Sequence, residues 1–274
     1  MIKKQTQNYP DIAQSFGIVG IIILGMLVFS PISLFAAKII GKEPAFLIYY
    51  LFAMGVPMLI VNKIRISKIG IINSNFDFKF SSTKLMLLVT ITILAIQIGI
   101  VSPIVGSLPM PDFMKKIFLE VAGRTGISSF IVIVIAAPIL EELIFRGIIL
   151  KGLLTKYTPI KSIIISSLLF GIVHLNPWQF IAAMIIGVFS GWIYYKTKKL
   201  TLSILIHMVN NFFAFMSMYF MNPETIFEEK LVDSYGGGII TFMIITIGAL
   251  LISGIGIYLL NKDFENTDKA KDII

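Results

Sequence analysis

Long runs of apolar residues recur along the whole chain and constrain its fold more than any other feature. A helix that crosses the hydrocarbon core of a bilayer needs about 20 mostly apolar residues. Eight segments fit this description, at residues 15–38, 45–62, 84–108, 127–150, 161–176, 178–195, 200–221 and 237–260. Helices satisfy their own backbone hydrogen bonds, as lipid requires. The sequence therefore predicts an all-α integral membrane protein with about eight transmembrane helices.

The composition agrees with a membrane-embedded chain and narrows its partners. Charged residues make up 14% of the chain and the mean hydropathy is +0.91, whereas a soluble domain has about 25% charged residues. The net charge of +8 comes from basic residues in the short loops between apolar runs. This placement favours anionic lipid headgroups over nucleic acid as the partner. The absence of cysteine excludes disulfides and thiol catalysis.

The distribution of lysine and arginine predicts the orientation. If both termini are cytoplasmic, most of the 23 basic residues lie on the cytoplasmic side, as the positive-inside rule requires. We therefore predict a multi-pass protein of the cell membrane that forms a single polytopic domain over residues 1–274. Two segments do not resemble spans. Residues 64–82 alternate like a short hairpin, and residues 111–126 resemble an amphipathic helix on the outer surface.

Five ionisable side chains fall inside the predicted spans: Glu141, Glu142, Arg146, His174 and His207. A charge in the bilayer core costs at least about 2.5–3.5 kcal/mol, so such residues mark a functional site by default. Glu142 and Arg146 are four residues apart on one helix face and can pair. Glu141 points about 100° away from Glu142 and can face another group.

Two further pairs have the same spacing of four residues. They are Phe170 and His174 in "FGIVH", and His207 and Asn211 in "HMVNN". The ionisable residues and these pairs lie on the fourth, fifth and seventh predicted helices. We therefore expect these three helices to form one buried polar site.

The three motifs together resemble a known family. "EELIFR" matches the pattern EExxxR, "FGIVH" matches FxxxH and "HMVNN" matches HxxxN, in this order and on separate spans. This combination resembles the CAAX-protease and bacteriocin-processing (Abi) family of intramembrane proteases, which includes the Ras-converting CAAX endopeptidase of eukaryotes. The motif-bearing catalytic core covers residues 127–215. The resemblance implies an endopeptidase that cleaves near the end of a membrane-associated peptide or protein, either lipidated and CAAX-like or bacteriocin-like.

The resemblance also implies roles for the site residues. Glu141 would activate a water molecule together with His174, while His207 and Asn211 would stabilise the oxyanion. The pair of Glu142 and Arg146 would hold the helix face that presents Glu141. Phe170 would pack beside the site, where it is a candidate for substrate binding.

Alternatives remain open at the level of the sequence. Glu141, His174 and His207 also form a ligand set that suits zinc, although the HExxH arrangement is missing, which favours a mechanism without a metal. Buried Glu, Arg and His residues also occur in proton-coupled transporters. A third hypothesis is a non-catalytic immunity or scaffolding member of the same fold.

Overall fold

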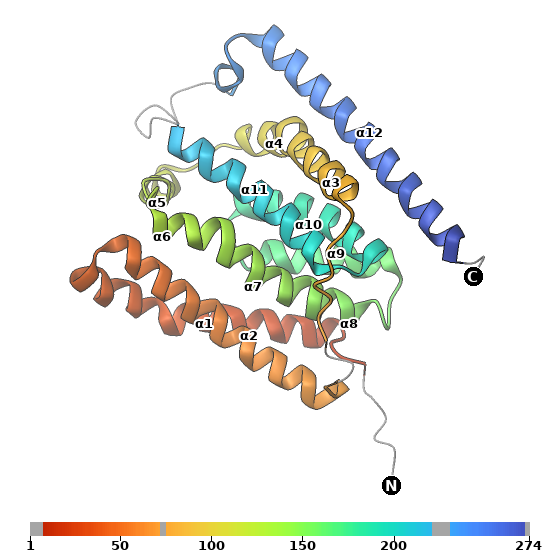
Figure 1. Cartoon of the computed structure of the whole chain (residues 1–274). Helices are drawn as coiled ribbons and strands as arrows, with labels where there is room; N and C mark the ends of the chain where they lie inside the picture. Colours follow the sequence, from red (N-terminus) through yellow and green to blue (C-terminus); the bar gives the residue numbers. More distant parts are fainter. Residues whose placement is uncertain (1–7, 72–74, 221–230, 272–274) are drawn as a thin grey trace. The chain divides into compact units, whose positions relative to one another are not determined.

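The computed structural model describes residues 8–71, 75–220 and 231–271, and Figure 1 shows that they are almost entirely helical. These described residues contain no strand, so the all-α prediction is confirmed and the hairpin predicted over residues 64–82 is wrong where it is described. Residues 72–74 lie outside the described part. Seven described helices are long and apolar enough to cross a membrane, as expected of a multi-pass membrane protein: Ile12–Ile40, Lys42–Ile69, Thr83–Gly106, Ile127–Leu153, Pro177–Thr197, Leu200–Phe220 and Ile239–Asn266.

The chain divides into two compact units. The first contains Met1–Lys79 and Gly126–His207, and the second contains Phe80–Thr125 and Met208–Ile274. The division falls inside helix α11 (Leu200–Phe220), directly after His207. The single polytopic domain therefore stays a prediction, and each unit is described by itself.

In the first unit, helices α1 (Ile12–Ile40) and α2 (Lys42–Ile69) form a tightly packed pair. They are separated by Gly41, whose φ of 87° is accessible to glycine at little cost. Gly25 of α1 packs so closely against α2 that an added Cβ would lie 2.8 Å from the carbonyl oxygen of Ala53. Helix α2 continues past the predicted span end and buries Arg65, whose guanidinium lies 4.5 Å from the centre of the Phe76 ring.

The central element of the first unit is the helical segment Ile127–Leu153. It consists of α6 (Ile127–Phe130), η3 (Ile131–Ala136), α7 (Ala137–Ile144), η4 (Phe145–Leu150) and α8 (Lys151–Leu153), in which η3 and η4 are π-helical. Pro138 lacks an N–H group and its ring disfavours a regular helix turn before it. The wider π-helical turns of η3 directly precede this proline, as expected for a distortion with an identifiable cause.

Helices α9 (Pro159–Ile172) and α10 (Pro177–Thr197) pack against each other through small residues. A Cβ added to Gly187 of α10 would lie 3.0 Å from the Ser167 side chain. Helix α9 has 14 residues, so the fifth predicted span, 161–176, is shorter than expected. Its end is set by Asn176, which caps α10, and by Pro177, which disfavours helix in the residue before it.

The second unit contains α3 (Thr83–Ile96), η2 (Gln97–Val101), α4 (Ser102–Gly106), α5 (Asp112–Ala122), η5 (Asp233–Tyr235) and α12 (Ile239–Lys271). Helices α3 and α12 pack closely, and Lys84 and Asp263 form an ion pair with an N–O distance of 2.8 Å between them. Helix α5 falls within residues 111–126 and confirms that this segment is helical. Its predicted position on the outer membrane surface stays a prediction.

Candidate active site

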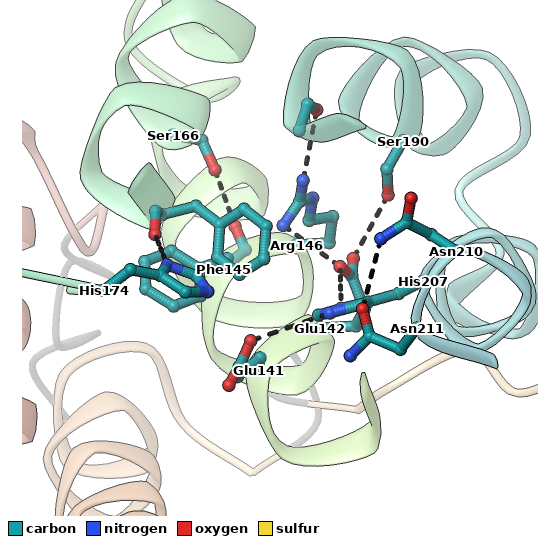
Figure 2. Close-up of polar contacts among 12 residues, drawn as sticks. Glu141, Glu142, Phe145, Arg146, Ser166, His174, Ser190, His207, Asn210 and Asn211 are labelled. Carbon is teal, nitrogen blue, oxygen red and sulfur yellow. Dashed lines mark hydrogen bonds and ion pairs between the residues drawn. The ribbon is translucent and has the colours of Figure 1, made fainter. Parts of the chain in front are cut away.

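Glu142, on α7, is buried and fully engaged by three other side chains (Figure 2). Its Oε1 lies 3.1 Å from Arg146 Nη1 and 3.1 Å from His207 Nδ1, and its Oε2 accepts a hydrogen bond of 3.2 Å from Ser190. The predicted pairing of Glu142 with Arg146 is therefore confirmed. Such a carboxylate has little capacity for a further ligand.

Glu141, the neighbouring carboxylate, is engaged differently. The hydroxyl of Tyr50 donates a hydrogen bond of 2.7 Å to its Oε1. Its Oε2 lies 3.8 Å from His207 Nε2, which is too long for a direct hydrogen bond. A water molecule about 2.8 Å from each atom could contact both. The side chain of Glu141 is 11% exposed and that of Glu142 is 1% exposed, so Glu141 is the carboxylate with room for another ligand.

The two histidines are held by different acceptors, which fixes the roles of their ring nitrogens. His174 Nδ1 lies 2.8 Å from the carbonyl oxygen of Phe170, and a carbonyl only accepts, so Nδ1 carries the proton and Nε2 of the neutral ring is an acceptor. His207 Nδ1 donates to the Glu142 carboxylate. Protonation of His207 would therefore place an N–H on Nε2, on the side of Glu141.

Phe170, on α9, contacts Arg146 and both histidines. Its ring meets His174 edge-on at 5.1 Å and His207 edge-on at 5.4 Å between ring centroids. The Arg146 guanidinium lies 4.8 Å from the centre of the same ring. Phe170 is buried, so the expectation that it packs beside the site is confirmed. Its predicted contact with substrate stays a prediction.

His174 departs from its expected position, whereas Asn211 lies on the expected helix. His174 lies beyond the end of α9, in the turn before α10, instead of on the fifth helix as predicted. It still reaches back to Phe170, because the turn places the ring one turn away from that residue. Asn211 lies one turn after His207 on α11, and its Oδ1 accepts a hydrogen bond of 3.2 Å from Asn210.

Sequence reasoning missed Tyr50 and Ser190, which contact the two glutamates. Each is an uncharged hydroxyl in an apolar helix, so no insertion cost singled it out. A signal for α10 was available, because Gly187 and Gly191 form a GxxxG pattern of the kind that allows close helix packing. Gly187 also accepts a hydrogen bond of 3.1 Å from Arg146 through its carbonyl oxygen.

The proposed zinc ligands do not form a set that fits a metal ion. Within the described part of the chain, no three His, Cys, Asp or Glu side chains are arranged as metal ligands. No step of the chemistry is therefore derived through a metal.

Comparisons with known proteins identify the part of the chain that carries this site. Residues 123–213 match the family model described as "Type II CAAX prenyl endopeptidase Rce1-like". The matched residues include Glu141, His174, His207 and Asn211 but not Tyr50. No solved structure matches the chain.

Two curated proteins are similar over part of their length. "Putative membrane peptidase YdiL" of Bacillus subtilis is 37% identical over 80 residues, which are 29% of this chain and 33% of that protein. "UPF0177 protein YxdF" of Lactococcus lactis is 27% identical over 125 residues, which are 45% of this chain and 65% of that protein. The chain thus covers a third of one relative and under two thirds of the other.

The matched residues and the three motifs coincide along the chain. The family model ends two residues after Asn211 and begins upstream of α6. The resemblance inferred from the motifs is therefore confirmed. Residues 123–213 are similar to the Rce1-like CAAX endopeptidases.

Proposed function

We propose that this protein is an intramembrane endopeptidase in which Glu141 acts as general base. The observation that carries the proposal is the unequal engagement of the two adjacent glutamates. Glu142 is occupied by Arg146, His207 and Ser190, whereas Glu141 retains an oxygen beside His207 Nε2 and a partly exposed side chain. A candidate general base must reach the proton that it removes, and this geometry favours Glu141.

The proposed reaction begins with a water molecule between Glu141 and a peptide carbonyl. Glu141 takes a proton from the water as its oxygen attacks the carbonyl carbon, and Nε2 of His174 accepts the second water hydrogen in a hydrogen bond. The carbonyl oxygen becomes an oxyanion. Glu141 then returns the proton to the amide nitrogen, so the C–N bond breaks and an acid and an amine are released.

His207 and Asn211 are the proposed donors to the oxyanion. Glu141, Glu142 and Arg146 carry a formal charge of minus one, and an imidazolium at His207 would bring the buried cluster to zero. In that form Nε2 donates, while Nδ1 stays bonded to Glu142. Donors held in place before the reaction are worth most in a site that excludes water.

The proposed substrate is a peptide at the membrane with a hydrophobic or lipidated end. The site residues on α7 and α11 belong to helices that are long and apolar enough to cross a membrane, so a substrate has to reach a site inside such helices. The family model that matches residues 123–213 is described as a CAAX prenyl endopeptidase, which supports this class of substrate. We place both termini in the cytoplasm in this proposal.

The test compares membranes that contain the wild-type protein with membranes that contain Glu141→Gln. Gln keeps the shape and removes the base, and loss of a general base costs about 10²- to 10⁴-fold in rate. Peptides released from the membranes are identified by terminal-peptide mass spectrometry at equal expression. The matched control is Glu120→Gln, because Glu120 is an exposed glutamate on α5.

Fragments that disappear in Glu141→Gln and persist in Glu120→Gln would support the proposal and would name the substrate. Identical fragment profiles for all three proteins would contradict it. A non-catalytic scaffold or a transporter would then explain the buried polar residues better.

A further inference from the structure

Tyr50 is the contact of Glu141 that lies outside the matched family residues. It belongs to α2, and its hydroxyl donates to Glu141 Oε1 at 2.7 Å across 91 positions of sequence. Tyr50 is buried, with 9% of its surface exposed. Its ring meets Phe46 edge-on at 6.4 Å, which restrains the ring from one side.

Helix α2 contacts the segment Ile127–Leu153 at a second point, one that aligns the two elements. Glu43, at the start of α2, accepts hydrogen bonds from the backbone N–H groups of Gly126 (3.4 Å) and Ser129 (3.1 Å). Seven residues separate Glu43 from Tyr50, so both project from one face of α2, about 10 Å apart along its axis. Helix α2 is thus hydrogen-bonded to the glutamate-bearing helix at two places, through Glu43 at the start of that helix and through Tyr50 at Glu141.

The hydrogen bond from Tyr50 defines which oxygen of Glu141 can act. A carboxylate can rotate about its last torsion, which is broad and roughly two-fold. With Oε1 held by the hydroxyl, Oε2 is the oxygen that lies 3.8 Å from His207 Nε2. Without the hydroxyl, the approach of His207 Nε2 at 3.8 Å is too long for a hydrogen bond to hold the carboxylate plane.

We propose that Tyr50 is a positioning residue for Glu141, so that α2 is part of the active site although it lies outside the matched residues. Tyr50 holds Oε1 and directs Oε2 toward the water and His207. It does not touch the substrate. The inference rests on the proposed role of Glu141 as general base.

The test is the steady-state kinetics of purified Tyr50→Phe on a synthetic peptide that spans the cleavage site found in the comparison above. Tyr50→Phe loses a hydrogen bond to a charged group, and from the free energy of such a bond we expect kcat to fall about 10- to 100-fold. KM stays close to the wild-type value, since Tyr50 acts through Glu141.

The matched control is Tyr49→Phe. Tyr49 is the adjacent residue on α2, and its hydroxyl lies 3.4 Å from the carbonyl oxygen of Met26, away from the glutamates. This variant loses the same atom from the same helix, and we expect its kcat and KM to match the wild type. Equal melting temperatures of the two variants would show that the kinetic loss is not a loss of fold.

A second variant guards against misfolding. Replacement of Tyr50 by a fluorinated tyrosine keeps the hydroxyl that donates to Glu141, so we expect this variant to keep a kcat close to that of the wild type. An unchanged kcat in Tyr50→Phe, with Glu141→Gln inactive, would overturn this inference and leave the proposed function intact. An active Glu141→Gln would instead overturn the proposed function.

Discussion

Removal of the Glu142 charge takes from Arg146 its ion-pair partner in the interior of the first unit. Both side chains are 1% exposed, and their charged atoms are 3.1 Å apart. At an effective dielectric constant of about 20, that separation corresponds to a Coulomb attraction of about 5 kcal/mol. Glu142→Gln keeps the volume and deletes this attraction, so we expect the free energy of unfolding to fall by about 3–5 kcal/mol.

The double variant Glu142→Gln/Arg146→Met discriminates charge compensation from simple loss of contacts. Removal of both members of a buried pair is often nearly neutral, because neither desolvated charge is left alone. The hydrogen bond from Arg146 to the Gly187 carbonyl is lost as well, at about 1 kcal/mol. We therefore expect the double variant to be more stable than Glu142→Gln by about 2 kcal/mol or more.

The assay is unfolding of the purified protein in detergent by titration with SDS, followed by far-UV circular dichroism. The control pair is Glu120 and Arg124 on the second unit, which has the same spacing of four residues and an N–O distance of 3.4 Å, but is more exposed. Breaking this pair should cost less than about 1 kcal/mol. A Glu142→Gln variant that is no less stable than Glu120→Gln, or a double variant less stable than the single, would refute the charge argument.

Two further predictions concern helix ends. Glu43→Gln weakens the cap at the start of α6, since a charged acceptor of two backbone N–H groups becomes neutral, and we expect a loss of about 1 kcal/mol in the same unfolding assay. The backbone N–H of Gln14 donates to the Asp11 carboxylate and lowers the pKa of Asp11. The cap therefore stabilises α1 above the unfolded-state pKa of Asp11, and this stabilisation is lost as the pH falls through the lower folded-state pKa. Protection of the Gln14 amide against hydrogen exchange should decrease with acidification in the wild type. In Asp11→Asn the protection should be independent of pH.

Part of the site could be predicted from the sequence, because helix periodicity is a local property of the chain. The spacing of Glu142 and Arg146 predicted their ion pair, and the two histidines drew attention as buried ionisable residues. Expectations failed where the backbone left the helix. His174 was assigned to a helix that ends two residues earlier, because the cap and proline that begin α10 compete with the apolar run.

The sequence by itself determined the class of the protein, because apolar length and buried charge are properties of single segments. It could not determine which partner each polar side chain meets. Tyr50 carries no charge and lies far along the chain from Glu141, so nothing local marks it as a contact of that carboxylate. Contacts from Tyr50 of α2, Ser190 of α10 and His207 of α11 decided that Glu142 is fully engaged and that Glu141 keeps an oxygen beside His207. Hydrogen bonds between helices depend on distances that only the tertiary structure sets.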